Sequence, residues 1–186
     1  MPLIFKDAIM EAKENNEGGL RIVGIGMNEA ELEYNPVLKE RVVKDLNKDP
    51  VIDEPLSPLR SWLSSTVCVV SIDYLTQPRE VLASILKQTI PGCWVHLVIS
   101  NRCFPTKAIA RWLTISEEER LQMVGDYLWF SGWKDIEIVE LSNGREEKPV
   151  EGLLGKMGMM GRVDPLWVVR GRKPATEDSS GIKDEL

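Results

Sequence analysis

The sequence has no long apolar run and no start that resembles a secretory signal. No apolar run reaches the roughly 18–20 residues that a membrane-spanning helix requires. The opening MPLIFKDAIMEAKENNEGG has neither a basic start nor a long apolar stretch. These absences predict a cytoplasmic location. The final Lys183-Asp184-Glu185-Leu186 reads as an endoplasmic-reticulum retrieval signal, but without an entry signal we expect it to be inert.

Cysteine and histidine are also scarce, and acidic residues outnumber basic ones, 29 to 23. Cys68, Cys93 and Cys103 are odd in number and widely spaced, which suits neither a disulfide framework nor a zinc site, so no metal site is predicted. The single histidine, His96, stands in phase with Trp94 in an apolar run, which favours a core or edge position over a catalytic base. The net charge of −6 argues against nucleic acid as the main partner.

The 186 residues, 43% of them hydrophobic, are enough for one globular domain with a sizeable core. We expect a single domain over residues 1–173. From Pro174 to the end, residues 174–186 look like a disordered tail.

Apolar and polar residues alternate along the chain in a pattern that predicts six strands and several helices. The run Ser64–Ile72 is nearly continuous in apolar residues, as in a strand buried on both faces. The other strands are expected at Leu20–Ile25, Arg41–Leu46, Cys93–Ile99, Asp135–Leu141 and Leu166–Arg172, and the helices at Glu29–Tyr34, Gln77–Thr89, Thr106–Leu113 and, after the capping box Ser116–Glu119, to about Tyr127.

Strands and helices alternate through the middle of the chain, which predicts a mostly parallel sheet flanked by helices. The end of the chain differs. Two strands follow each other with only a glycine-rich stretch, Ser142–Met160, between them, and we expect that stretch to be an irregular insertion. This ending suits an antiparallel pair at the edge of the sheet.

Two stretches could carry a ligand. Gly24-Ile25-Gly26 follows a strand and precedes a helix, as in a dinucleotide-binding turn, but the third glycine of that fingerprint is absent. A tight strand-to-helix turn explains it equally well. Ser100-Asn101-Arg102 interrupts LVISNRCFPTKAIARWL at the carboxyl end of a strand, where ligands bind in α/β sheets. The alternative there is a polar loop with a helix cap.

The amino-acid sequences of several segments resemble those of class I S-adenosylmethionine (SAM)-dependent methyltransferases of the type 11 group, most closely the fungal members. The resemblance runs from about Leu20 to Lys173. It rests on the order and spacing of GIGMNEAEL, NPVLKERVVKDLN, VSIDYLTQPREVL, SNRCFPTKAIARWL, MVGDYLWFSGW and DPLWVVR. It implies an α/β, Rossmann-like three-layer sandwich of seven strands, with the last strand antiparallel.

The resemblance also implies a cofactor, SAM, and roles for particular residues. The turn after the strand Leu20–Ile25 would hold the ribose of SAM, and the end of the strand Arg41–Leu46 would contact its adenine. The ends of the strands Ser64–Ile72 and Cys93–Ile99 would face the methyl group and the substrate. The residues implied are, for SAM, Gly24, Gly26, Asn28, Glu29, Asp45, Leu46 and Ser71; for catalysis, Asp73 and Tyr74; and for the substrate, Asn101, Arg102 and Phe104.

The sequence departs from this family in two places. The family's central first strand would fall at Met1–Phe5, which no glycine-rich turn follows. The segment that leads into the strand Ser64–Ile72 reads LSPLRSWLSST, where an acidic segment is usual in the family. Both departures suggest a product that is truncated or diverged at its amino terminus.

Three functions therefore remain open. The first is a methyltransferase, or a descendant of one, acting on a small molecule. The second is a catalytically inactive methyltransferase-like binding or scaffold protein, with a protein partner or a second copy covering the weakened sheet. The third is a nucleotide-dependent oxidoreductase that uses the Gly24-Ile25-Gly26 turn.

Overall fold

The computed structural model describes residues 21–52, 63–144, 147–149, 160–162 and 164–175. The chain divides into two compact units, Met1–Asp49 and Pro50–Leu186, and each is treated by itself. The expected first strand, Met1–Phe5, lies outside the described residues, as does most of the expected tail.

The first unit contains a parallel pair of strands joined by a short helix. β1 (Val23–Gly26) and β2 (Glu40–Val43) pair in parallel, with Gly26 opposite Val43, and α2 (Glu29–Glu33) connects them. This confirms the strand, helix and strand that the sequence predicts here.

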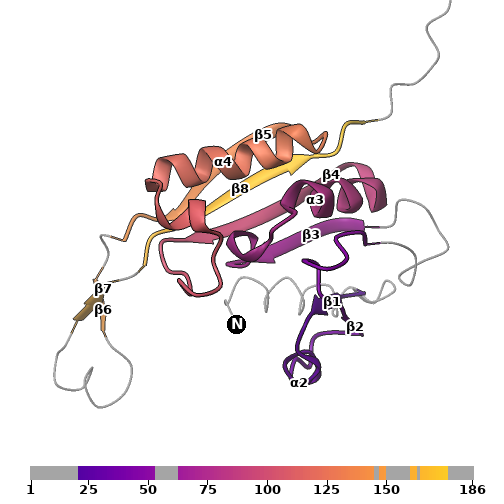
Figure 1. Ribbon diagram of the computed structural model, residues 1–186, viewed down its shortest axis with the longest axis horizontal. Coiled ribbons are helices and arrows are strands. Elements are labelled where there is room, and N and C mark those ends of the chain that lie inside the picture. The colour runs from indigo at the N-terminus through magenta and orange to yellow at the C-terminus, as the bar shows by residue number, and fades with distance from the viewer. Residues whose placement is uncertain (1–20, 53–62, 145–146, 150–159, 163, 176–186) are drawn as a thin grey trace, which may run out of the picture. The chain divides into compact units, whose positions relative to one another are not determined.

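The second unit is built on a four-stranded sheet (Figure 1). Its strands are β3 (Leu63–Val69), β4 (Thr89–Ser100), β8 (Leu166–Arg172) and β5 (Lys134–Ser142), in that order across the sheet. β3 and β4 are parallel, whereas β8 is antiparallel to both of its neighbours. The expected antiparallel pair near the sheet edge is confirmed, with β5 at the edge itself.

Two helices cover one face of this sheet. α3 (Pro78–Gln88) begins with a proline at its first position, and α4 (Glu117–Phe130) begins with the predicted capping box of Ser116 and Glu119. The indole N–H of Trp133 donates to the carbonyl of Leu82 at 3.2 Å and so joins the two helical regions. The most deeply buried side chains between helices and sheet include Leu82, Val95, Leu97, Val124, Leu128, Trp133 and Val169.

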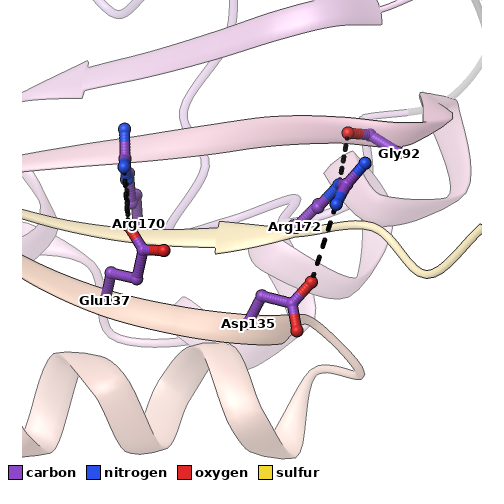
Figure 2. A network of polar contacts seen from close by, with 5 residues as sticks. All are labelled: Gly92, Asp135, Glu137, Arg170 and Arg172. Atoms are coloured by element: carbon purple, nitrogen blue, oxygen red, sulfur yellow. Dashed lines mark hydrogen bonds and ion pairs between the residues drawn. The ribbon is translucent and has the colours of Figure 1, made fainter.

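Polar and aromatic side chains line the other face of the sheet. Arg170 pairs with Glu137 at 2.6 Å, while Arg172 donates to the Gly92 carbonyl at 2.8 Å and faces Asp135 (Figure 2). The guanidinium of Arg170 also lies 4.8 Å from the centre of the Trp94 ring. This face is therefore held together by contacts that cross β4, β8 and β5.

Three expectations were wrong. β3 is not buried on both faces, because Val69 on the side opposite the helices is 44% exposed. The helix expected at Thr106–Leu113 is only a 3-10 turn, Ala110–Leu113, because the Ile109 N–H bonds the Asp73 carbonyl rather than a helical partner. The irregular insertion contains a small hairpin, β6 (Glu147–Pro149) paired with β7 (Met160–Arg162).

No helix in the described part of the chain is both long enough and apolar enough to cross a membrane.

Candidate functional site

The glycine turn after β1 is packed rather than open. A Cβ on Gly24 would clash with the side chain of Leu38, and a Cβ on Gly26 would lie 3.4 Å from Leu32. Gly24 therefore lets Leu38, in the approach to β2, come close to the strand, whereas a Cβ on Gly26 would make only an ordinary contact. This packing explains Gly24 without a bound phosphate, as the tight-turn interpretation of the sequence expects.

The other predicted cofactor residues of this unit gather at one end of its strands. Because β1 and β2 are parallel, Asn28 and Asp45 both follow their carboxyl ends. Asn28 caps α2 through a hydrogen bond from the Glu31 N–H at 3.4 Å, and Asp45 accepts from the Asn47 N–H at 3.0 Å. Glu29 is exposed in the first turn of α2. The structure brings these residues to the same end, where two of them also have local structural roles.

Asp73 is the most unusual residue at the sheet end of the second unit. It lies in a 3-10 turn, Ile72–Tyr74, just after β3, and it is only 3% exposed. Its Oδ2 is buried without a hydrogen-bond partner within the described part of the chain. Burial raises the pKa of this carboxyl, against weaker lowering by a hydrogen bond from the backbone of Asp73 itself and by the positive charge of Arg120. A buried carboxyl with an unused oxygen is a candidate proton acceptor.

Tyr74 links the end of β3 to the loop after β4. Its hydroxyl accepts a hydrogen bond from the Phe104 N–H at 3.0 Å, and the two rings are 6.4 Å apart between centres. The Phe104 ring is 67% exposed, and the ammonium of Lys107 lies 5.4 Å from its centre. A predicted catalytic residue and a predicted substrate residue, separated by 30 positions in the sequence, are thus in direct contact.

The remaining predicted residues of this unit are more exposed. Arg102 pairs with Asp164, just before β8, at 2.9 Å. Its backbone N–H donates to the Ser100 hydroxyl at 3.2 Å, and Asn101 beside it is exposed. The hydroxyl of Ser71 donates back to the Val69 carbonyl at 2.8 Å. These side chains form an exposed polar rim at the strand ends, around the more buried Asp73.

Backbone strain marks the same end of β3. Val70 has a φ of 46°, a region that β-branched residues rarely adopt. Its N–H bonds the Val98 carbonyl at 2.9 Å, which holds the chain in this conformation as it enters the Ser71–Tyr74 segment. Strain of this kind tends to occur at functional sites. Sequence reasoning missed Val70, because nothing in the residue itself signals a positive φ.

The thiol of Cys68, near the end of β3, is not a candidate nucleophile. Burial, with a smaller contribution from the charge of Asp73, raises the pKa of Cys68 to about 11. The thiol therefore stays protonated near neutral pH and is a poor nucleophile. No group of three potential metal-ligating side chains occurs in the described ranges, and Cys68, Cys93 and Cys103 are free there.

Similarity to solved structures, over about nine tenths of this chain, shows its fold. A SAM-dependent methyltransferase from Archaeoglobus fulgidus superposes with a TM-score of 0.55 at 12% identity, covering 90% of this chain and 81% of that one. A SAM-dependent methyltransferase from Thermotoga maritima gives 0.51 at 14% identity, covering 92% and 91%. The fold is that of the class I methyltransferases. Neither a protein-family model nor a curated protein matches the sequence.

The same fold also carries other chemistry. The cyclase SpnF superposes with a TM-score of 0.51 at 13% identity, covering 92% of this chain and 72% of that one. Similarity at such identities shows the fold alone, so an activity has to be argued from the residues at the site.

The acceptor groups in the first unit fit the ribose of SAM. Ribose presents two hydroxyl donors, and carboxylate oxygens are strong acceptors for them. Asp45 is half-buried and Glu29 exposed at the same end of the parallel pair, and half-buried Leu46 could lie against an adenine ring. In the second unit, Oδ2 of Asp73 is a buried carboxylate oxygen without a hydrogen-bond partner among the described residues.

Proposed function

We propose that this chain is a class I SAM-dependent methyltransferase, or a descendant of one, that acts on a small molecule. The buried Asp73 with its unpartnered oxygen carries the proposal, because it follows a parallel strand in a fold shared with SAM-dependent methyltransferases. The sequence motifs favour the type 11 group and its fungal members.

In this proposal the first unit binds the nucleoside half of the cofactor. Asp45 and Glu29 accept the ribose hydroxyls, Leu46 packs against the adenine, and Asn28 fixes the start of α2 so that Glu29 is presented. Gly24 acts indirectly, because it allows the close packing of Leu38 against this turn.

The second unit binds the substrate and handles its proton. SAM, when bound, supplies a methyl carbon that is already activated for displacement. The Asp73 carboxylate takes the proton from the substrate atom as that atom becomes nucleophilic, and its raised pKa suits this task. Tyr74 and Ser71 border the space where the substrate meets Asp73. Phe104, Asn101 and Arg102 position the substrate.

A turnover assay tests this proposal. The purified chain is incubated with SAM and a panel of small hydroxyl, amine and carbon acids, and S-adenosylhomocysteine is measured. Asp73→Asn should lower kcat by about a hundredfold or more, the size expected for losing a general base. Equal turnover by wild type and variant would show that Asp73 is not the general base.

The packing at Gly24 favours a second candidate, an inactive binding protein on the same fold. Its Cβ position faces Leu38 rather than open space, so the turn needs no cofactor to explain it. This candidate predicts a folded chain that does not bind SAM and that has a protein partner or forms a homodimer.

A further inference from the structure

An apolar groove lies between α4 and the edge strand β5, away from the strand ends discussed above. Leu121 and Gly125 of α4 and Ile136 and Ile138 of β5 are among the residues that line it, and its volume is about 290 Å³. A Cβ on Gly125 would make an ordinary contact with Ile136, at 3.8 Å, so α4 and β5 pack closely at this point. Gln122, Asp126 and Trp129 complete the lining.

Large apolar side chains remain exposed along this groove. Trp129 is 56% exposed and Ile138 is 51% exposed. Exposed apolar side chains of this size in one place mark an interaction surface. The groove is partly open to solvent and small, so it suits side chains of a protein segment better than an enclosed small molecule.

The charges around the groove indicate what charge its partner carries. On the opposite face of the sheet, the β5 carboxylate of Glu137 is already neutralised by Arg170 (Figure 2). On the groove side, Glu140 of β5 shares the face of Ile138 and lies near the start of α4. Burial raises the pKa of Glu117, and the charges of Glu118 and Glu140 add to this effect against the opposing charge of Arg120, so the three carboxylates lie within electrostatic range of one another. This end of the groove therefore has an acidic potential.

The end of the groove near Trp129 carries a different charge. The ammonium of Lys134 lies 4.3 Å from the centre of the Trp129 ring, so that end is not acidic. β5 is the last strand of its sheet, and its register shifts near both ends confine regular pairing to Glu137–Glu140. Such irregular, charged edges discourage indiscriminate strand pairing. Binding here would thus depend on side chains in the groove.

We propose that the groove between α4 and β5 binds a segment of another protein that carries apolar side chains flanked by lysine or arginine. The apolar side chains pack on Ile138 and Trp129, and the basic side chains meet the cluster of Glu117, Glu118 and Glu140. A second copy of this chain is disfavoured, because the chain is acidic overall, with a net charge of −6. The inference is independent of SAM binding and of catalysis.

Peptide selection tests the proposal. Short random peptides displayed on phage are selected on the full chain, with Ile138→Ser as the counter-target. We expect enriched peptides that combine lysine or arginine with leucine, isoleucine, valine or phenylalanine. A lack of enrichment, or enrichment of acidic peptides, would overturn the proposal.

Binding of a synthetic enriched peptide, followed by fluorescence anisotropy, then maps the site. Ile138→Ser and Trp129→Ala should each weaken binding about tenfold, as losses at interface centres commonly do. Glu140→Gln should reduce the salt dependence of binding. Val67→Ser, an exposed aliphatic position on the distant strand β3, is the matched control and should change nothing. Unchanged binding to Ile138→Ser, or a dimer in sedimentation that this substitution dissociates, would contradict the assigned partner.

Discussion

At the residue scale, Asp73 combines a structural cost with a proposed role in catalysis. Its carboxyl is almost completely buried, and desolvation raises its pKa. A group with a raised folded-state pKa holds its proton more tightly in the folded chain than in the unfolded chain. The free energy of unfolding therefore rises as the pH falls from neutral through the folded-state pKa, and it levels off below the unfolded-state value of about 3.9.

Asp73→Asn should consequently stabilise the protein at neutral pH, by about 1 kcal/mol, because it removes a buried and incompletely solvated charge. The gain should shrink as the pH falls toward the unfolded-state pKa, where wild-type Asp73 is neutral as well. Urea unfolding of both proteins at several pH values measures this difference. A gain that is constant across pH would show that the charge is not its source.

Val70 is the second residue with a measurable cost. At its φ of 46° a glycine is free of the steric clash that valine suffers, so Val70→Gly should be close to neutral or stabilising. The matched substitution Val69→Gly, in ordinary strand conformation one residue earlier, should destabilise by about 1 kcal/mol. Chemical denaturation of the two variants gives the comparison. Equal losses at both positions would argue against strain at Val70.

At the element scale, the start of α4 depends on its capping box. The Ser116 hydroxyl accepts from the Glu119 N–H at 3.2 Å, and the Glu119 carboxylate accepts from the Ser116 N–H at 2.8 Å. Ser116→Ala should lower the free energy of unfolding by about 1 kcal/mol. Ser116→Asp retains an acceptor and should restore most of that loss in the same denaturation experiment.

The loop after β4 depends on Tyr74. Removing its hydroxyl in Tyr74→Phe leaves the Phe104 N–H to bond water, and should cost about 1 kcal/mol. Amide hydrogen exchange in the peptide around Phe104 should become faster, while exchange in α4 stays unchanged. If the Phe104 amide exchanges at the same rate in both proteins, the hydrogen bond does not order the loop.

Elements with strong local signals were predictable from the sequence. The capping box at Ser116 fixed the start of α4, and the apolar run Leu166–Arg172 matches β8 at both ends. The turn at Ala110–Leu113 was not predictable, because a hydrogen bond between the distant Ile109 and Asp73 decides it. The hairpin of β6 and β7 was missed because its strands are three residues long and carry no apolar alternation.

The candidate site was likewise predictable from the sequence only in part. The sequence placed Asp73 and Phe104 after neighbouring strands, because parallel strands end at one edge of a sheet. It could not show the burial of Asp73 or the contact from Tyr74 to Phe104, since both depend on how distant segments pack. It also missed the groove, although Trp129 and Phe130, outside the apolar stripe of α4, were a signal of an exposed apolar surface.

At the scale of the whole molecule, the class I methyltransferase fold is present in a chain whose expected first strand, Met1–Phe5, lies outside the described residues. The proposed function requires that the end of the β1–β2 pair still binds the nucleoside half of SAM. The two candidate functions differ most simply at this step, because the inactive binding protein does not need the cofactor.

Calorimetric titration of the purified chain with SAM is therefore the most direct test. We predict a dissociation constant in the micromolar range, weakened about tenfold in Asp45→Asn, which keeps the acceptor oxygen for the Asn47 N–H but loses the carboxylate charge. No heat of binding from a folded chain, or binding that Asp45→Asn leaves unchanged, would contradict the proposed cofactor site.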